Sequence, residues 1–579
     1  MEGPTRIRAW LSGLILAALI LAALPAAATA APAVTTTADG GPGSLREAVA
    51  LAAPGETITI PSGSYKLVLG ELTIAKSLTL AGAGAKTTIL EGGGASRVID
   101  ATNAAAEVTI SDLTIRGGHV HTGIAEGGGI FSQAGHLTLL RDTITENTSD
   151  ATSPGAAGGI ADGGGVTVHL ETNAALTVRD STITGNVANA SGDTGKPGGI
   201  AEGGGLYVRF SGAVEVSGST ISGNQALTRG GGIATGGGVF FSDNSQPGSL
   251  STSTLSGNLA ESGSDASGGG GFIITGGPYP FALDRVTATG NSSVSGNGMG
   301  EGGGLSLGGS ANGAVRMIAS TLAGNAANNG GNLGAGSELS IGDTVISTGS
   351  GNAGKENCEG AAGITSLGFN LDSLDECDFH AAGDRVNLDP KLGPLADNGG
   401  PTATMLPAAS SPLVNAGASF GLSADQRGLT RPIEYPGVSN STAPGADGSD
   451  IGAVELQLPP PAKPANPPPP SAAITIKLGK LKKNSKKGTA TLTVTFSGPA
   501  TGTLSLSGKG LKSRSRSVAG VSSAQLVLAT TGKARRGLRR NGKQSVRFAV
   551  TFVPSSGAAV SAGRGAKLTR RLQRTRAGS

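Results

Sequence analysis

Aromatic residues, cysteine and tryptophan are scarce in this chain of 579 residues. Aromatic side chains make up 3% of it, there are two cysteines, and the single tryptophan is Trp10. Glycine is abundant, with 99 residues, but it does not recur at every third position, which excludes a collagen triple helix. Valine, isoleucine and leucine recur in an ordered pattern that a disordered chain lacks. The composition therefore indicates an ordered, glycine-rich protein, and its length predicts at least two folded units.

The chain has only one long apolar run. The run reads LSGLILAALILAALPAA, follows Arg6 and Arg8, and ends at the small residues Ala28, Thr29 and Ala30. This order is typical of a secretory signal peptide, here residues 1–30. No other apolar stretch is long enough to cross a bilayer. We therefore expect a secreted protein, extracellular or associated with the cell surface, without a transmembrane span after processing.

The two cysteines are Cys358 and Cys377. In an exported chain disulfides persist, so we expect the two residues to form a bridge. Two cysteines alone make a poor zinc site, which also favours the bridge.

Acidic residues are absent from the C-terminal part of the chain. From Ala472 to Ser579 there are 23 lysines and arginines and no Asp or Glu. The preceding part holds all 40 acidic residues and the remaining 21 of the 44 basic residues, a net charge of −19. A proline-rich segment, residues 457–471, separates the two parts and predicts a stiff, extended linker.

A repeat of 33 to 39 residues fills the middle of the acidic part. Six glycine triplets are each followed, 20 to 23 residues later, by an asparagine that ends a segment such as TISGN. The triplets begin at Gly127, Gly163, Gly203, Gly236, Gly269 and Gly302, and the asparagines are Asn147, Asn186, Asn224, Asn258, Asn291 and Asn325. Self-similarity at this period is typical of a solenoid.

Apolar residues alternate with polar ones inside each repeat. Leu206, Val208 and Phe210 fall on one face of a strand, and Val214 and Val216 repeat the alternation. We predict three short strands per coil and a parallel β-helix, whose coils are stable only when stacked because one coil cannot offset its ordering entropy. Each asparagine is expected to occupy a left-handed turn and to join a hydrogen-bonded ladder along the stack.

The segment before the first coils has the pattern of a short helix. Ser44 and Glu47 have the spacing of a capping box, and Leu45, Ala48 and Val49 share one helical face. Such a helix would cover the exposed edge of the first coil. Residues 31–354 are therefore expected to form a helical cap followed by β-helix repeats.

Three motifs resemble known families of bacterial surface proteins. TTTADGGPGSLREAVALA resembles the CSLREA motif, with Gly43 in place of the cysteine, and the GGG[ILV] and [IL]xxN pairs resemble the repeats of polymorphic outer membrane proteins. SLGFNL, NLDPKLGPLADNGGPTATMLPAASSPLVNAGA, DQRGLTRP and DIGAVEL resemble the choice-of-anchor Q domain over residues 355–456. The resemblance implies a right-handed parallel β-helix of the pectin-lyase-like superfamily, exported to the cell surface, and it transfers no catalytic residue. The turn-rich pattern of residues 355–456 also predicts that they finish and cap the solenoid.

The basic part, residues 472–579, contains five short runs of alternating apolar residues, typical of a small Ig-like β-sandwich with a basic tail. Its charge would attract an anionic surface such as a wall polymer, lipid head groups, nucleic acid or the acidic β-helix itself. Few aromatic residues are present for base stacking, so no specific nucleic-acid partner is predicted. The alternative is that the charge serves only solubility.

Carboxylates directly before three of the triplets are the candidate metal ligands. If the coils stack in register, Glu126, Asp162 and Glu202 form a column at about 4.8 Å spacing, and like charges so close favour a bound cation, here calcium. The alternative is a set of ordinary exposed loop carboxylates. His119 and His121 share a strand face, but the sequence offers no third ligand beside them.

We expect a non-catalytic cell-surface adhesin or scaffold that binds a polysaccharide or another cell-wall polymer. The alternative is a polysaccharide lyase or glycoside hydrolase acting on acidic polysaccharides. The carboxylate and basic motifs of such enzymes are absent from the sequence. After removal of the signal peptide no tryptophan would remain, which leaves few aromatic faces for binding sugar rings. An ordered trio of carboxylates on one face of the structure would favour the enzyme.

Overall fold

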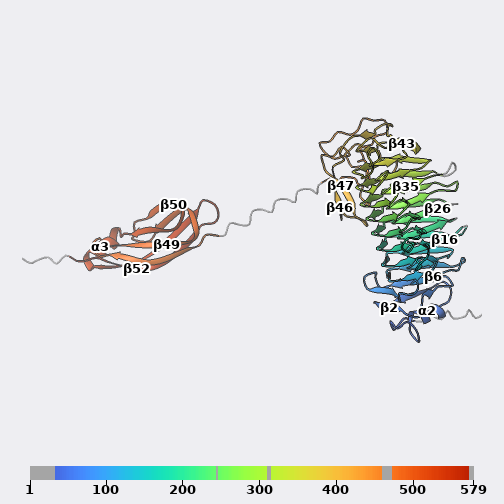
Figure 1. Ribbon diagram of the computed structural model, residues 1–579. Helices are drawn as coiled ribbons and strands as arrows, with labels where there is room; N and C mark the ends of the chain where they lie inside the picture. Colours follow the sequence, from blue (N-terminus) through green and yellow to red (C-terminus); the bar gives the residue numbers. More distant parts are fainter. Residues whose placement is uncertain are drawn as a thin grey trace, which may run out of the picture. The chain divides into compact units, whose positions relative to one another are not determined.

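The computed structural model describes residues 33–171, 173–210, 212–242, 246–309, 314–458 and 473–572. The predicted signal peptide and most of the predicted linker lie outside these residues. The chain divides into two compact units, residues 1–458 and 459–579 (Figure 1). No helix in the described ranges is both long and apolar enough to cross a membrane.

The first unit is a parallel β-helix, as predicted. Three parallel sheets, A, B and C, enclose its core. Sheet A contains β1 (Glu56–Ile60), β4 (Leu78–Gly82), β7 (Glu107–Ser111), β12 (His136–Leu140), β17 (Ala175–Arg179), β22 (Ala213–Ser217), β27 (Gly248–Ser251), β32 (Phe281–Asp284), β36 (Val315–Ile318), β40 (Leu339–Gly342) and β43 (Ile364–Gly368). Sheet B contains β2 (Gly63–Leu67), β5 (Thr88–Gly92), β8 (Thr114–Arg116), β13 (Thr143–Thr145), β18 (Thr182–Thr184), β23 (Thr220–Ser222), β28 (Thr254–Ser256), β33 (Thr287–Thr289), β37 (Thr321–Ala323), β41 (Val345–Ser347), β44 (Leu371–Asp372) and β45 (Arg385–Val386).

Sheet C contains β3 (Leu72–Thr73), β6 (Ile99–Ala101), β11 (Ile130–Ser132), β16 (Val166–Leu170), β21 (Leu206–Phe210), β26 (Val239–Ser242), β31 (Gly271–Ile274), β35 (Leu305–Gly308), β39 (Leu333–Ala335) and β42 (Cys358–Glu359). The alternating apolar residues of the three sheets point inward and form one buried cluster, in which Leu206, Val208 and Val216 are fully buried. This burial, repeated coil by coil, stabilises the stack.

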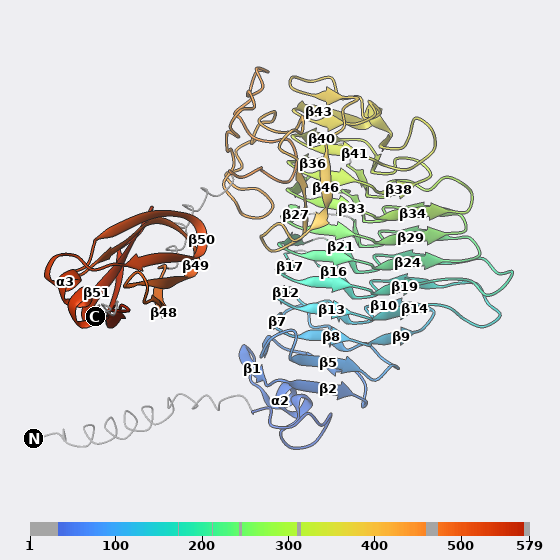
Figure 2. The same cartoon turned by 90° about the vertical axis from the view of Figure 1, so that its left-hand side faces the viewer.

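Two further parallel sheets, D and E, form a thin projection that we call the fin. Sheet D contains β9 (His119–His121), β14 (Thr148–Asp150), β19 (Val187–Asn189), β24 (Gln225–Thr228), β29 (Leu259–Ser262), β34 (Ser292–Ser295) and β38 (Ala326–Ala327). Sheet E contains β10 (Ile124–Glu126), β15 (Ile160–Asp162), β20 (Ile200–Glu202), β25 (Ile233–Thr235) and β30 (Asp265–Ser267). Figure 2 shows the strands of sheet D as a column beside sheet B. The prediction of three strands per coil is therefore wrong for these coils. Coils with a strand in both sheets have five, and the two that contribute only β34 or β38 to sheet D have four.

The core of the fin consists almost entirely of alanine. Its buried side chains are Val120, Ala125, Ala151, Ala161, Ala188, Ala190, Ala201, Ala226, Ala234 and Ala260. Alanine allows the backbones of sheets D and E to approach closely, and each strand contributes only one or two such residues. The fin thus adds parallel ladders to each coil with little apolar burial of its own.

The glycine triplets form the neck between the fin and the main core. In Gly203–Gly205, the first glycine has a φ of 61°, and a Cβ on Gly204 would lie 2.3 Å from the carbonyl oxygen of Gln225. A Cβ on Gly205 would meet the side chain of Asn224. The segments that enter and leave the fin therefore cross in backbone contact, which only glycine permits.

The fifth triplet begins one residue earlier than predicted. Gly268, not Gly269, has the positive φ of a first glycine, 66°, and Gly271 takes the strand position that pairs with Val239 and Leu305. The expectation that the asparagines occupy left-handed turns is also wrong. The left-handed residue is the one before each asparagine, such as Gly223 with a φ of 62°.

The predicted helical cap is confirmed as α2 (Leu45–Leu51). The Ser44 hydroxyl accepts a hydrogen bond from the Glu47 N–H at 3.1 Å. Leu45, Ala48 and Val49 are buried in the same core as the first coils, so the helix covers the apolar end of the stack.

Residues 355–456 do more than cap the solenoid. Their first part, which includes η1 (Ala361–Gly363), adds the last strands of the main sheets. The chain then forms an antiparallel pair, β46 (Leu392–Ala396) and β47 (Thr404–Pro407), and returns along earlier coils (Figure 1). Gln426 is fully buried there, donates to the Ser253 carbonyl at 3.1 Å and accepts from the Thr287 hydroxyl at 2.6 Å. This return segment acts as a strap along the side of the stack.

The second unit is an antiparallel β module consistent with a sandwich. It contains β48 (Ile476–Asn484), β49 (Thr489–Ser507), β50 (Arg514–Leu528), β51 (Lys543–Pro554), β52 (Val560–Thr569) and one helix, α3 (Gly532–Asn541). β49 pairs with β48, β50 and β51, and the rings of Phe496 and Phe552 meet at 4.9 Å within one buried core. Two predicted strands are joined in β49, and the sequence indicated neither α3 nor β52.

Candidate functional site

The three candidate carboxylates stand in one column at the end of sheet E next to the neck. Glu126, Asp162 and Glu202 end β10, β15 and β20, and they pair in register from coil to coil. Thr235 occupies the next position, where its hydroxyl lies 3.4 Å from the Glu202 carboxylate. Each carboxylate directly precedes the first glycine of a neck, so the neck fixes where the chain turns from the fin into sheet C.

Asp162, in the middle of the column, is buried. It is 5% exposed, and its Oδ1 atom is inaccessible and without a hydrogen-bond partner. Burial, followed by the charges of Glu202 and Glu126, raises the pKa of Asp162 to about 8. Burial also raises the pKa of Glu202. The reading of these residues as ordinary exposed loop carboxylates is therefore wrong for Asp162.

Sheet C contributes the groups that face this column. The His169 Nε2 atom lies 2.9 Å from the Glu126 Oε1 atom. Burial and then the charges of Asp162 and Glu202 raise the pKa of Tyr207, and the positive charge of Arg209 opposes the upward shifts of the two carboxylates. We call this group of six side chains the junction cluster: Glu126, Asp162, Glu202, His169, Tyr207 and Arg209.

A ladder of rings runs along the outside of sheet C through the same cluster. Its members are Phe131, His169, Tyr207, Phe240 and Phe272, with successive centroids 5.7, 5.9, 5.1 and 5.4 Å apart. The last three rings are parallel, with interplanar angles of 6°, and Tyr207 and Phe240 are buried. The ladder was not predicted, although four of its five rings occupy the second position after a glycine triplet.

The predicted asparagines form a continuous buried ladder. In each step from Asn147 to Asn325, the Nδ2 atom of one asparagine donates to the Oδ1 atom of the next at 2.9–3.0 Å. The ladder continues through Asn332 and Asn357, which the sequence analysis did not single out. Asn332 takes the place of the third glycine in its coil, and so reaches the same column.

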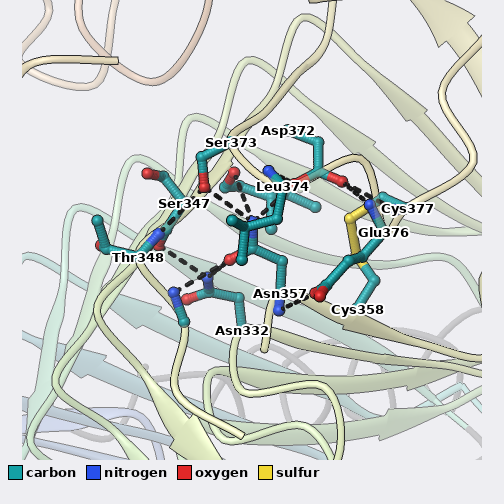
Figure 3. Close-up of a disulfide and its surroundings, with 12 residues drawn as sticks. Asn332, Ser347, Thr348, Asn357, Cys358, Asp372, Ser373, Leu374, Glu376 and Cys377 are labelled. Carbon is teal, nitrogen blue, oxygen red and sulfur yellow. Dashed lines mark hydrogen bonds between the residues drawn. A yellow bond between two sulfur atoms is a disulfide. The ribbon is translucent and has the colours of Figure 1, made fainter. Parts of the chain in front are cut away.

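The ladder ends beside the disulfide. Cys358 and Cys377 are bonded and buried, with Cα atoms 5.2 Å apart. Asn357 donates to the Asp372 carboxylate at 2.6 Å, and that carboxylate accepts from the Cys377 N–H at 2.9 Å (Figure 3). The bridge thus fixes the loop that terminates the polar spine of the β-helix.

The junction cluster has oxygen ligands suited to a hard cation. Carboxylates are the preferred ligands of calcium, and the unpartnered Oδ1 atom of Asp162 lacks the donor or cation that a buried carboxylate needs. Without a cation, Asp162 avoids a buried negative charge by holding a proton, as its raised pKa indicates. The site can therefore exchange a proton for a cation.

Comparison with known proteins adds little to this description. No protein-family model matches the chain, and no curated protein matches it. Among solved structures it is similar to a pectin methylesterase from carrot, with 12% sequence identity over 57% of this chain and 85% of that chain, and a TM-score of 0.24. At this TM-score the similarity carries no argument about function. The assignment to the parallel β-helices follows from the in-register parallel pairing of the sheets themselves.

Proposed function

We propose that this protein is an exported, non-catalytic binder of acidic polysaccharides and that the junction cluster binds them through calcium. The observation that carries the proposal is the stacked trio of carboxylates with the buried, unpartnered Oδ1 atom of Asp162 at its centre. A polyanion would be repelled by this column. A calcium ion held by the column can take further oxygen ligands from the polymer, because calcium accepts six to eight.

The arrangement along the β-helix axis supports a polymeric ligand. Residues at equivalent positions recur at the strand spacing of about 4.8 Å, so Glu126, Glu202 and Thr235 offer a row of oxygen atoms parallel to the axis. Arg209, which is exposed beside the row, adds a positive charge that would attract an acidic polymer.

A glycoside hydrolase is the second candidate, and one observation favours it. Asp162 holds a proton near neutral pH between two other carboxyl groups, which is the arrangement of a general acid beside a nucleophile or base. Neighbouring strands are about 4.8 Å apart, close to the separation of about 5 Å between the carboxyl groups of retaining enzymes. The two functions differ in their use of calcium. Binding of the polymer would require the ion, whereas in the hydrolase a cation on the column would displace the proton of Asp162 that the general acid needs.

The test uses the mature chain, residues 31–579, with a panel of acidic and neutral polysaccharides, in calcium or in a chelator. The binding proposal predicts retention of acidic polymers in calcium only, and its loss in the variant E126Q/D162N/E202Q. The matched control E107Q/E146Q/E171Q replaces three exposed glutamates and should bind normally. New reducing ends or unsaturated products, absent from the first variant, would instead establish an enzyme. Neither retention nor cleavage would refute both functions.

We infer that the basic second unit attaches the protein to an anionic surface. Its described residues include no acid, and four arginines of α3, Arg535, Arg536, Arg539 and Arg540, are exposed. The resemblance to CSLREA and choice-of-anchor Q proteins supports a location at the cell surface. Binding of the mature chain to an anionic wall polymer should weaken steeply with salt and in the variant R535Q/R536Q/R539Q/R540Q. Binding that is insensitive to both changes would refute this role.

A further inference from the structure

A second cluster of potential metal ligands lies on the fin, on the outer side of sheet D. His119 and His121 are the two ends of β9, and Val120 between them points into the alanine core. The next strand, β14, places Asp150 in register with His121. The third ligand that is missing from the sequence around the histidines is therefore supplied by the neighbouring coil, 29 residues further along the chain.

The distances among these three residues fit a small transition-metal ion. The Asp150 Oδ2 atom lies 3.1 Å from the His121 Nδ1 atom and 3.6 Å from the His119 Nε2 atom. One ligand atom from each residue can lie within 4.8 Å of the other two. Zinc bonds of 2.0–2.1 Å in a tetrahedron place ligand atoms about 3.3 Å apart. The cluster is thus close to the required geometry before any ion binds.

Two further observations point to a ligand at this position. The His119 Nε2 atom is inaccessible to solvent and has no hydrogen-bond partner, although the side chain as a whole is 41% exposed. The other carboxylate oxygen of Asp150 accepts a hydrogen bond from the Thr152 N–H at 3.1 Å, which leaves Oδ2 directed at the histidines. Outer hydrogen bonds of this kind orient the ligands of metal sites.

We propose that His119, His121 and Asp150 form a binding site for a zinc-class divalent ion. Two imidazoles and one carboxylate are ligands that zinc, cobalt, nickel and copper accept, whereas calcium and magnesium prefer oxygen ligands alone. The three protein ligands leave coordination positions open for water or for a donor atom of a partner, since the His121 side chain is 54% exposed. β9 is the edge strand of sheet D, so the ion would also tie this edge to the next coil.

This proposal is independent of the junction cluster, which lies where sheet E meets sheet C. The experiment is a titration of the untagged mature chain with zinc in competition with a chromophoric chelator, followed by cobalt, whose visible spectrum reports the ligands. We expect one equivalent bound by the wild type, none by H119Q/H121Q, and affinity lowered at least about tenfold in D150N. Calcium at the same concentration should not displace the zinc.

The matched control is a second histidine and aspartate pair, to which the described part of the chain adds no third ligand. His380 lies 2.9 Å from Asp378, and both side chains are well exposed. The variant H380Q/D378N should bind zinc like the wild type. Absence of zinc binding by the wild type would refute the site and leave a simple ion pair. Undiminished binding in H119Q/H121Q or in D150N would also refute it, and the circular dichroism of each variant shows whether it has folded.

Discussion

Removing one asparagine from the ladder should open the β-helix locally. Asn224 is fully buried, and its side chain takes part in four hydrogen bonds. Its Nδ2 atom donates to the Ile183 carbonyl at 2.9 Å and to the Asn258 Oδ1 atom at 3.0 Å. Its Oδ1 atom accepts from the backbone N–H and the side-chain amide of Asn186 at 3.0 and 2.9 Å. The variant N224A deletes all four bonds and leaves the buried Asn186 N–H without this acceptor.

The expected cost is about 3–4 kcal/mol, because the variant loses four hydrogen bonds and each contributes about 1 kcal/mol net. Solenoids do not unfold in a single step, so global denaturation would dilute the effect. Hydrogen exchange of peptides spanning residues 182–262 measures the local opening directly. Amides there should exchange about a hundredfold to a thousandfold faster in the variant.

The matched control is Asn352, which donates to the Asn329 side chain at 3.1 Å at an exposed position. The variant N352A also loses a hydrogen bond between two asparagines, yet water can replace it, so its exchange should change little. If N224A and N352A have equal effects, the ladder does not stabilise the stack and the reasoning is wrong.

Three further predictions concern the neck, the column and the bridge. G204A should lower the melting temperature by several degrees, because its Cβ would overlap the crossing backbone, whereas G123A, with nothing within 4 Å, should not. The pKa of Asp162 in the folded protein, about 8, is above its unfolded value. The stability of the wild type relative to D162N should therefore fall as pH rises from about 4 to about 8. Parallel pH profiles of the melting temperature in the two proteins would contradict this. Reduction of the bond between Cys358 and Cys377, 19 residues apart, should destabilise the C-terminal coils by about 3 kcal/mol in denaturant titrations, and an unchanged midpoint would contradict it.

The sequence predicted the main coils because their inward positions need large apolar side chains. Leu206 and Val208, or Val214 and Val216, alternate with polar residues and so reveal both a strand and its buried face. The fin gave no such signal. In β20 only Ala201 is buried within three residues, and an alanine between an isoleucine and a glutamate does not distinguish a strand from a turn. Helix α3 was missed for a similar reason, since Leu538 is its only buried side chain.

The site could be predicted only in part from the sequence. The carboxylate column could be predicted because Asp162 and its two equivalents each directly precede a triplet. Strands that pair in register place such equivalent residues together. Its partners could not be predicted, since His169 and Tyr207 reach the column only through the neck, which sets how sheet C follows sheet E. His119 and His121 could be identified from the sequence, but Asp150 could not, because it lies one coil away and meets them only through the register of sheet D.

The neck links the stability of this β-helix to its candidate site. Where the third glycine is replaced by Asn332, sheet E has already ended at β30, and only the two residues of β38 remain in sheet D. Glu301 precedes a triplet in the last such coil but meets Ser267 and Asn329 instead of other carboxylates. The column therefore forms only where consecutive coils keep both a complete neck and an acidic residue before it. The glycine triplets that permit the stack are therefore also a requirement for the carboxylate column.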